Sequence, residues 1–352
     1  MPYRAAVEDY RFLIEDVLDF DALRASDRYA EATDDVTAAI LSEAGRMCDD
    51  VLAPLQRGGD LHPAKLENGV VRTSPGFSDG FAAIAEGGWI GMSADPEFGG
   101  MGLPMTLTTA VNEMMSGACL SLQLAPLMSQ GQIEALEHHA SDAVKELYLP
   151  KLISGEWTGT MNLTEPQAGS DVGALSSRAE DNGDGTYAVS GQKIYISWGD
   201  NDFAGNVCHL VLARLPGAPA GTKGISLFLV DTSLPGFSKG RNLDKIGQHS
   251  GDTSELFFSD MRIPASALLG EEGQGFVYLM RELPRERLVI GALGVAAARG
   301  SLDMTIQYAQ ERELFGQKLS QLQNTRFEIA RMEPAYRINK AIVDQCIREY
   351  KQ

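Results

Sequence analysis

The stretch MNLTEPQAGSDVGAL, residues 161–175, lies where the sequence changes from helical to strand-like periodicity. Its Pro and Gly residues predict an ordered loop rather than a regular element. Such a loop offers backbone N–H groups, with the hydroxyls of Thr164 and Ser170, to the edge of a ring or to a phosphate. A purely structural loop explains the same residues equally well. The flanking sequence is therefore needed to distinguish a ligand-binding loop from a structural one.

The sequence before this loop is mostly helical up to about Leu149. Apolar residues recur at spacings of three and four in DDVTAAILSEAGRMCDDVLAPL (34–55) and in TTAVNEMMSGACLSLQLAPLMSQGQIEALEHH (108–139). Between these segments, GMSADPEFGGMGLPM (91–105) is rich in Gly and Pro and predicts an ordered loop.

Short β-branched and aromatic runs begin at about Trp157 and predict an antiparallel β-domain: TYAVSGQKIYISWG (186–199), NVCHLVLARL (206–215), GISLFLVD (224–231) and SELFFSDMRIP (254–264). Helical periodicity returns from about Gly275. Segregated helices and strands favour an α+β fold over a βαβ sheet. We therefore expect a helical domain over 1–156, a β-barrel-like domain over 157–271 and a helical domain over 272–352.

The composition and charge narrow the range of partners and cellular locations that we expect. The chain has 352 residues and a formal charge of -18, which disfavours nucleic acid and anionic lipid as partners. We expect no membrane span, because no stretch approaches about 18 consecutive apolar residues. The N-terminus lacks a targeting pattern, and the four scattered cysteines predict buried free thiols, so a cytoplasmic location is expected.

Standard catalytic motifs are missing. The sequence holds no GxGxxG opening a βαβ unit, no P-loop, no HExxH and no GxSxG, and we expect no metal site. The near-match GEEGQGF (270–276) predicts a turn. His138 and His139 lie in a polar helical stretch and are expected to be solvated rather than catalytic.

The loop at 161–175 resembles the TEPxAGSD signature of the acyl-CoA dehydrogenase family. The resemblance continues in DPEFGGMGLP, GQKIYISWG, MRIPASALLGEEGQGF and YAQERELFGQKLSQLQ, and it covers nearly the whole chain. Up to about Val230 the sequence is similar to the large bacterial members that include methylmercaptopropionyl-CoA dehydrogenase. From about Asp231 it is similar to long-chain and isovaleryl-CoA dehydrogenases, so the chain has the character of a mosaic.

The resemblance implies FAD as cofactor and a CoA thioester as substrate. Thr164 matches a threonine that bonds the flavin ring, Tyr195 an aromatic residue over its face, and Ser197 a hydroxyl near its N5 atom. Ser170 matches a serine near the CoA phosphates, whereas Met161 replaces an aromatic residue. The cofactor residues implied in this way are Leu163, Thr164, Gly169, Ser170, Tyr195, Ser197, Arg312, Phe315 and Gln323. The last three match residues that reach the FAD of a neighbouring subunit.

The segment YLMRELPRERLVI (278–290) resembles the helix that carries the catalytic glutamate of long-chain and isovaleryl-CoA dehydrogenases, and the match falls on Glu286. Arg287 would bind CoA or a carboxylate, and Ser170 would also contact the substrate. Pro284 predicts a helix beginning beside it, so Glu286 could equally be a favourable charge in a first helical turn. Glu282, one turn earlier, would raise the pKa of Glu286 by like-charge repulsion.

The implied reaction is α,β-dehydrogenation of an acyl-CoA to the trans-2-enoyl-CoA, with an electron acceptor such as electron-transfer flavoprotein. The alternatives are a related acyl-CoA oxidase or flavin monooxygenase, and an inactive, flavin-poor scaffold. The family implies a homo-oligomer. Because the chain stops at CIREYKQ where family members continue, and because Pro334 interrupts the last helical stretch, we expect these 352 residues alone to bind FAD weakly and to assemble poorly.

Overall fold

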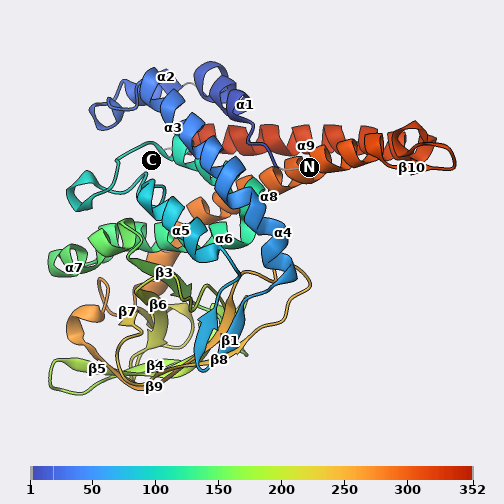
Figure 1. Ribbon diagram of the computed structural model, residues 1–352. Helices are drawn as coiled ribbons and strands as arrows, with labels where there is room; N and C mark the ends of the chain where they lie inside the picture. The colour runs from blue at the N-terminus through green and yellow to red at the C-terminus, as the bar shows by residue number, and fades with distance from the viewer. Residues whose placement is uncertain (1–2, 19, 351–352) are drawn as a thin grey trace. The chain divides into compact units, whose positions relative to one another are not determined.

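The computed structural model describes residues 3–18 and 20–350. The chain forms two compact units (Figure 1). The first unit contains Met1–Gln56, Leu103–Leu120 and Arg285–Gln352, and the second contains Arg57–Gly102 and Ser121–Pro284.

The helices of the first unit bury apolar stripes against one another. Thr33 caps the third helix, since its hydroxyl accepts a hydrogen bond from Val36 N at 3.4 Å, and Asp34 and Asp35 follow in the first turn. The α-helices that lie in this unit or enter it are α1 (Val7–Phe12), α2 (Phe20–Arg24), α3 (Asp34–Met47), α4 (Ala53–Leu61), α6 (Met105–His139), α8 (Gly275–Glu311) and α9 (Gln323–Glu349).

Two of these helices differ from the expectation. Cys119 interrupts α6 with a non-helical backbone at φ -154° and ψ 83°. The helix α9 runs through Pro334 from Gln323 to Glu349. Pro334 therefore does not end the last helix, although it removes one backbone donor from it.

The second unit is built around a seven-stranded sheet. Its strands are β3 (Trp157–Asn162), β4 (Arg178–Asp181), β5 (Thr186–Ser197), β6 (Asn206–Arg214), β7 (Ile225–Asp231), β8 (Phe237–Asn242) and β9 (Thr253–Pro264). The order is β3-β6-β4-β5-β9-β8, and β7 pairs with β6. The remaining elements of this unit are α5 (Phe77–Glu86), α7 (Asp142–Ile153) and the hairpin of β1 (Lys65–Glu67) with β2 (Val70–Arg72).

The expected strands are confirmed, but the sheet is not purely antiparallel. Strand β3 pairs with β6 in parallel, from Trp157 opposite Asn206 to Asn162 opposite Val211, and β4 meets β6 in parallel at Arg178 opposite Arg214. Parallel strands need a long connection between them, and residues 163–205 provide it. Period-2 alternation reveals which face of a strand is buried but not the direction of its neighbour, so the sequence missed this pairing.

The core of the sheet is apolar. Val189, Val211, Phe228, Leu256 and Met261 are fully buried, and the rings of Tyr187 and Phe228 meet edge to face with centroids 5.3 Å apart. Three of the cysteines, Cys48, Cys119 and Cys208, are buried free thiols as expected, whereas Cys346 is exposed on α9. The prediction that all four are buried is wrong for Cys346, because it faces away from the buried side chains of Asp344 and Ile347.

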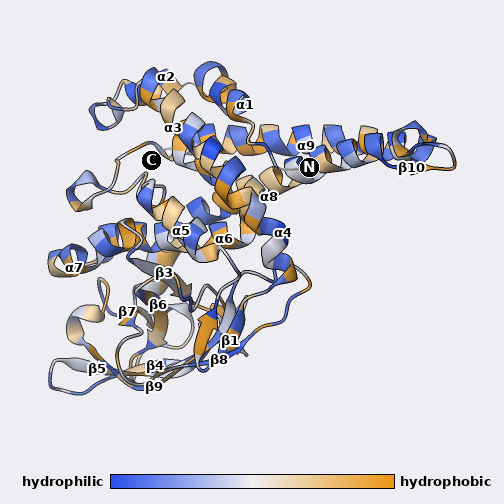
Figure 2. Ribbon diagram, viewed as in Figure 1, coloured by the Kyte–Doolittle hydropathy of each residue, from blue (hydrophilic) through white to orange (hydrophobic). Residues whose placement is uncertain are grey.

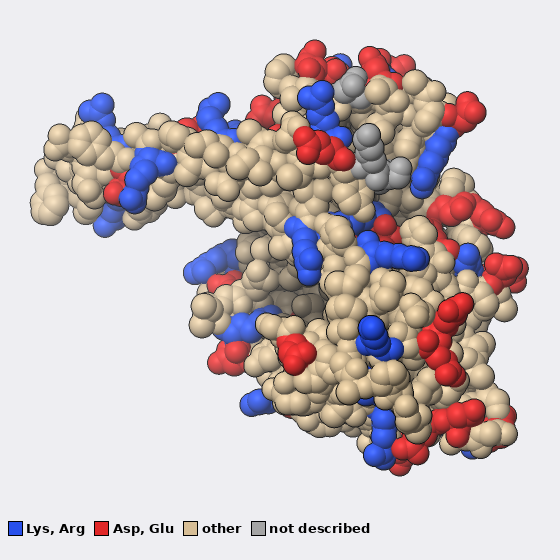
Figure 3. Space-filling view, turned by 180° about the vertical axis from the view of Figure 1, so that it is seen from behind, with Lys and Arg blue, Asp and Glu red and all other residues tan. Residues whose placement is uncertain are grey.

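Helix α8 bears on the expectation that the chain has no membrane span, which stays a prediction. Over Gly275–Glu311 it is long and apolar enough to cross a membrane by length and composition alone. Part of this apolar character lies in the protein core, because Leu279, Val289, Ala292 and Leu293 are buried. Figure 2 shows hydrophobic residues interspersed with hydrophilic ones along α8 and α9. Figure 3 shows charged side chains scattered among uncharged ones over one face of the molecule.

Candidate functional site

The loop after β3 is closed by its own backbone. Glu165 and Ala168 exchange two backbone hydrogen bonds of 3.0 Å, with Pro166 and Gln167 between them. The Pro- and Gly-shaped loop expected from the sequence is therefore present, and residues 169–171 follow it on the surface.

Thr164 lies at the start of this loop and beside β5. Its carbonyl accepts a hydrogen bond from Ile194 N at 3.0 Å. Within residues 3–18 and 20–350, neither its backbone N–H nor its hydroxyl makes a hydrogen bond. Thr164 is half-buried, so both donors are held in a fixed position and are available to a ligand. The expectation that Thr164 bonds the edge of a flavin ring stays a prediction.

Tyr195 is presented to solvent by a distortion of β5. The pairing of β5 with β9 shifts register between Lys193 and Ile196, and Tyr195 in this bulge has φ +63° with 66% of its surface exposed. A bulky residue in the left-handed region is strained, and such strain gathers at binding sites. Ser197, half-buried, lies two residues further along and pairs with Thr253.

The other expected residues of this unit have different surroundings. Leu163 and Met161 are half-buried, and Met161 lies within β3 opposite Leu210. Gly169 and Ser170 are exposed, and a Cβ added to Gly169 would meet no atom within 4 Å. The structure therefore brings Thr164 and Leu163 alongside β5, while Gly169 and Ser170 lie on an open surface.

Sequence reasoning missed the ion pair beneath this loop. The Lys193 ammonium donates hydrogen bonds to Glu165 Oε1 at 2.8 Å, to Leu212 O at 2.9 Å and to Leu163 O at 3.2 Å. The exposed fractions of the Lys193 and Glu165 side chains are 0% and 1%. A signal was present earlier in the strand, because Lys193 has the same parity as Tyr187 and Val189, whose side chains are buried.

A second buried carboxyl group, Asp252, fixes the backbone after Ser197. Its carbonyl accepts from Trp198 N at 3.0 Å, and its Oδ2 accepts from Ser254 Oγ at 2.7 Å and from Asp200 N at 3.2 Å. Burial raises the pKa of Asp252 to about 7, although these hydrogen bonds oppose the shift. The group is therefore neutral in the folded protein at mildly acidic pH.

We expect Asp252→Asn to become more stable relative to the parent as pH rises from 5 to 8. The folded pKa lies above the unfolded value of 3.8, so ionising Asp252 opposes folding by about 1.4 kcal/mol for each pH unit between the two pKa values. Asparagine cannot ionise and avoids this cost. Urea unfolding at both pH values measures the effect.

Asp202 provides a control of opposite sign. Hydrogen bonds from Thr73 hold the pKa of Asp202 below its ordinary value, so Asp202→Asn should lose stability relative to the parent as pH rises through the acid range. A stability difference between Asp252→Asn and the parent that is equal at pH 5 and pH 8 would contradict the prediction for Asp252.

Glu286 and Arg287 lie on α8 in the first unit. Glu286 is half-buried and its Oε1 atom is shielded from solvent, whereas Arg287 is exposed. The expectation that a helix begins beside Pro284 is wrong, because α8 begins at Gly275 and includes Pro284. Residues 275–283 already form the first turns of α8, and Pro284 lies within the helix that they begin. The first-turn explanation of Glu286 therefore falls away, since Glu286 lies about three turns into the helix.

The surroundings of Glu282 correct the expectation for His139. The side chains of Glu282 and His139 are each 6% exposed, and His139 Nε2 lies 3.6 Å from Glu282 Oε1. The His139 ring stacks on Tyr278 at 4.1 Å, and burial lowers its pKa to about 4. His139 is thus buried and neutral rather than solvated, because α8 covers it. His138 is exposed as expected.

These side chains also form a possible metal-ligand set. One ligand atom from each of Glu134, His138 and Glu282 lies within 4.8 Å of the others. Imidazole and carboxylate are suitable ligands for a divalent transition metal. The absence of a metal site stays a prediction.

Arg312, Phe315 and Gln323 lie where α8 gives way to α9. A two-residue turn, Phe315-Gly316, joins β10 (Glu313–Leu314) to β11 (Gln317–Lys318), with φ +54° and +75°. Positive φ at both positions is the signature of a tight hairpin, and it leaves Phe315 with 93% of its surface exposed. Arg312 and Gln323 are also exposed.

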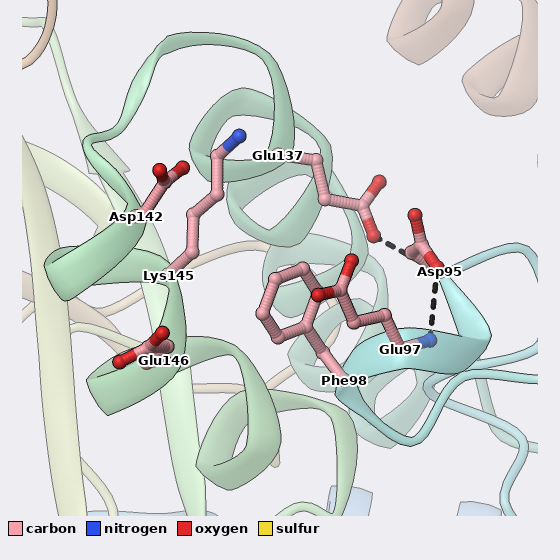
Figure 4. A pocket seen from close by; sticks show the side chains of 7 residues that line it. All are labelled: Asp95, Glu97, Phe98, Glu137, Asp142, Lys145 and Glu146. Atoms are coloured by element: carbon pink, nitrogen blue, oxygen red, sulfur yellow. Dashed lines mark hydrogen bonds between the residues drawn. The ribbon is translucent and has the colours of Figure 1, made fainter.

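A cavity of about 330 Å³ lies in the second unit. Figure 4 shows Glu97 and Phe98 from the loop after α5, Glu137 from the end of α6, and three residues of α7 around it. Asp95 N donates to Glu137 Oε1 at 2.8 Å, which orders the loop predicted over 91–105. Carboxylates dominate the lining, and none of the expected cofactor residues contributes to it.

Three family models match the chain in order. They are the N-terminal, middle and C-terminal domains of acyl-CoA dehydrogenase, over residues 37–156, 160–261 and 273–352. The boundaries of the expected domains, 1–156, 157–271 and 272–352, remain predictions.

Curated relatives and a solved structure agree with these matches. The chain is 39% identical to 3-methylmercaptopropionyl-CoA dehydrogenase of Ruegeria pomeroyi over 322 residues, which are 89% of this chain and 54% of that protein. This similarity therefore extends beyond Val230. The chain is 37% identical to the long-chain specific acyl-CoA dehydrogenase of Sus scrofa, over 60% of this chain and 49% of that protein. It thus spans about half the length of these relatives.

The solved structure is butyryl-CoA dehydrogenase from Megasphaera elsdenii. It superposes with a TM-score of 0.78 at 27% identity, covering 88% of this chain and 78% of that one.

Proposed function

The chain belongs to the acyl-CoA dehydrogenase family, and from this we propose that it catalyses the α,β-dehydrogenation of an acyl-CoA thioester to the trans-2-enoyl-CoA. Members of this family use FAD. The observation that carries the proposal is Thr164, whose N–H and hydroxyl are both available beside the strained, exposed Tyr195.

The residues present fit a flavin. Thr164 would donate to the ring edge, Tyr195 would cover one face of the ring, and Ser197 would place a hydroxyl at its reactive side. Leu163 would add an apolar contact, and the open backbone at Gly169 and Ser170 suits phosphate groups. When bound, FAD supplies the acceptor for the hydride that leaves the β-carbon.

Glu286 is the proposed base. Its carboxylate removes the proton from the α-carbon of the thioester, and its half-buried position limits hydration of the charge, which favours proton transfer. Arg287, exposed on the same helix, would bind the CoA portion, as would Ser170. The proposed partners are the acyl-CoA and an electron acceptor such as electron-transfer flavoprotein, and the proposed location is the cytoplasm.

The proposed assembly is a homo-oligomer. Large apolar side chains are exposed along α8, α9 and the hairpin between them, and a second copy of the chain would cover them. The exposed members are Val277, Met280, Ile290, Met304, Tyr308, Phe315, Phe327, Met332, Ile338 and Ile342.

Anaerobic bleaching of bound flavin by acyl-CoA substrates tests the reaction. We expect the flavin absorbance to fall on addition of substrate under anaerobic conditions. A protein that binds no flavin would support the scaffold alternative instead. Consumption of oxygen with an acyl-CoA would favour an oxidase.

Palmitoyl-CoA or isovaleryl-CoA should reduce the flavin faster than butyryl-CoA. The small residues Gly291, Ala292 and Gly294 follow Glu286 on α8, and a Cβ on Gly294 would meet no atom within 4 Å. Close helix packing therefore does not explain Gly294, which leaves room for an acyl chain as its role. Stopped-flow measurement of the rate of flavin reduction with each of the three substrates tests this preference for long or branched acyl chains. Faster reduction by butyryl-CoA than by the other two would refute it.

A further inference from the structure

We propose that Lys193 and Glu165 are positioning residues that hold Thr164 and β5 in the geometry a flavin ring needs. The proposal rests on the proposed function, because it assumes that Thr164 binds the cofactor. It extends that function to two residues that contact only protein.

The first observation is where the ammonium group binds. Lys193 contacts the residue on each side of Thr164, namely the carbonyl of Leu163 at 3.2 Å and the carboxylate of Glu165 at 2.8 Å. The next residue of β5 completes the arrangement, since Ile194 N donates to Thr164 O at 3.0 Å. Three consecutive residues of the loop are thus fixed to two consecutive residues of the strand.

The second observation is that both charged groups are saturated. Lys193 has three N–H donors and three acceptors, the third being Leu212 O at 2.9 Å. Glu165 Oε1 also accepts from Ser177 N at 3.0 Å, and Oε2 accepts from Ser176 N at 2.7 Å and Ser176 Oγ at 2.8 Å. The ammonium and these donors hold the pKa of Glu165 down, at about 2, although burial opposes the shift.

Stability alone does not account for the pair. Removing two charges from water costs several kcal/mol for each ion, and apolar replacements of buried pairs are often neutral or stabilising. Charged groups instead impose a specific geometry, because each of their hydrogen bonds fixes where the partner atom must lie. Here the partners lie on the loop of Thr164 and on the strand that carries Tyr195 and Ser197.

The geometry of Tyr195 follows from the same anchor. Lys193 points into the interior with no exposed surface, and two residues later Tyr195 is largely exposed with φ +63°. In a regular strand, residues two apart share a face. The bulge between Lys193 and Ile196 breaks that rule, and the buried Lys193 stands at its start.

The test is the double variant Lys193→Met/Glu165→Gln. It removes both charges together, so that no unpaired charge stays buried, and a glutamine oxygen in the place of Oε2 keeps an acceptor for Ser176 N and Oγ. We expect the melting temperature of the apoprotein to stay within a few degrees of that of the parent apoprotein. The dissociation constant of FAD should rise at least tenfold. At saturating FAD, we also expect shifts in the flavin absorption maximum and midpoint potential, which altered stability alone would not produce.

Lys239→Met is the matched control. Lys239 is a mostly buried lysine paired with Asp200, and it flanks Leu256 of β9 from the side opposite Lys193. It touches neither the loop of Thr164 nor β5, so its loss should leave the FAD dissociation constant within about twofold of the parent.

The outcomes separate the two proposals. If the parent binds FAD and the double variant binds it equally well with an unchanged spectrum and potential, the positioning role is wrong and the proposed function stands. If Lys239→Met weakens FAD binding as much as the double variant does, loss of any buried lysine of the sheet has the same effect. The positioning role is then also wrong. If the parent itself binds no FAD, the proposed function fails and the inference fails with it.

Discussion

Glu286→Gln should leave the binding of FAD and acyl-CoA unchanged and slow the reduction of the flavin by several orders of magnitude. Glutamine matches the shape of glutamate but cannot accept the α-proton at neutral pH, so the loss falls on the chemical step rather than on binding. Anaerobic stopped-flow spectroscopy measures the reduction rate. Titration of the flavin spectrum with a substrate analogue measures binding.

Glu282→Gln is the matched control for this variant. Glu282 is a glutamate of the same helix one turn earlier, and it contacts His139 at 3.6 Å rather than a position open to substrate. We expect it to lose far less than Glu286→Gln. If Glu286→Gln reduces its flavin at nearly the parent rate, another residue is the base.

Arg312→Ala should greatly weaken FAD binding and remove activity, and mixing it with Glu286→Gln should restore part of that activity. Glu286 and the end of α8 at Glu311 belong to one helix, and its rise of 1.5 Å per residue separates them by roughly 38 Å. An FAD whose ring lies near Glu286 does not extend to Arg312 of the same chain. We therefore propose that Arg312 serves the site of a second subunit.

The restoration follows from symmetry. In a mixed dimer one site combines the intact Glu286 of one chain with the intact Arg312 of the other, while the second site carries both substitutions. Equal amounts of the two chains, unfolded and refolded together, should recover about a quarter of the parent activity. Recovery no greater than the mean of the two separate variants would show that Arg312 acts within its own subunit.

The fold was largely predictable because its periodicities are long and uninterrupted. The strand segments 186–199, 206–215, 224–231 and 254–264 alternate or run apolar, and each of them contains a strand of the sheet. The return of helical periodicity at about Gly275 was predicted, and α8 begins there. The separate prediction of a helix that begins beside Pro284 was wrong, because proline is common at a first helical position, yet here Pro284 lies inside the helix. Local sequence does not distinguish a proline at a first helical position from one inside a helix. Here the turns of α8 before Pro284 are held by packing against other residues.

The candidate site was only partly predictable. Thr164 and Tyr195 were found through a motif, and the structure places Thr164 beside β5 and Tyr195 in its bulge. Lys193 and Glu165 were missed because they are far apart in sequence and meet only when the loop folds against β5. His139 was misjudged because its neighbours along α6 are polar, whereas its burial comes from α8. Contacts between distant segments leave no trace in local periodicity.

The parallel pairing of β3 with β6 sets the order of events during synthesis. When β3 leaves the ribosome, its partner strand is still unmade, and residues 163–205 must emerge before the two can meet. Closing so long a loop delays the pairing, because its entropic cost precedes the contacts that offset it. Thr164 and Tyr195 both belong to this intervening segment, so we expect the proposed flavin-binding surface to form late, after β6 has been translated as far as Arg214.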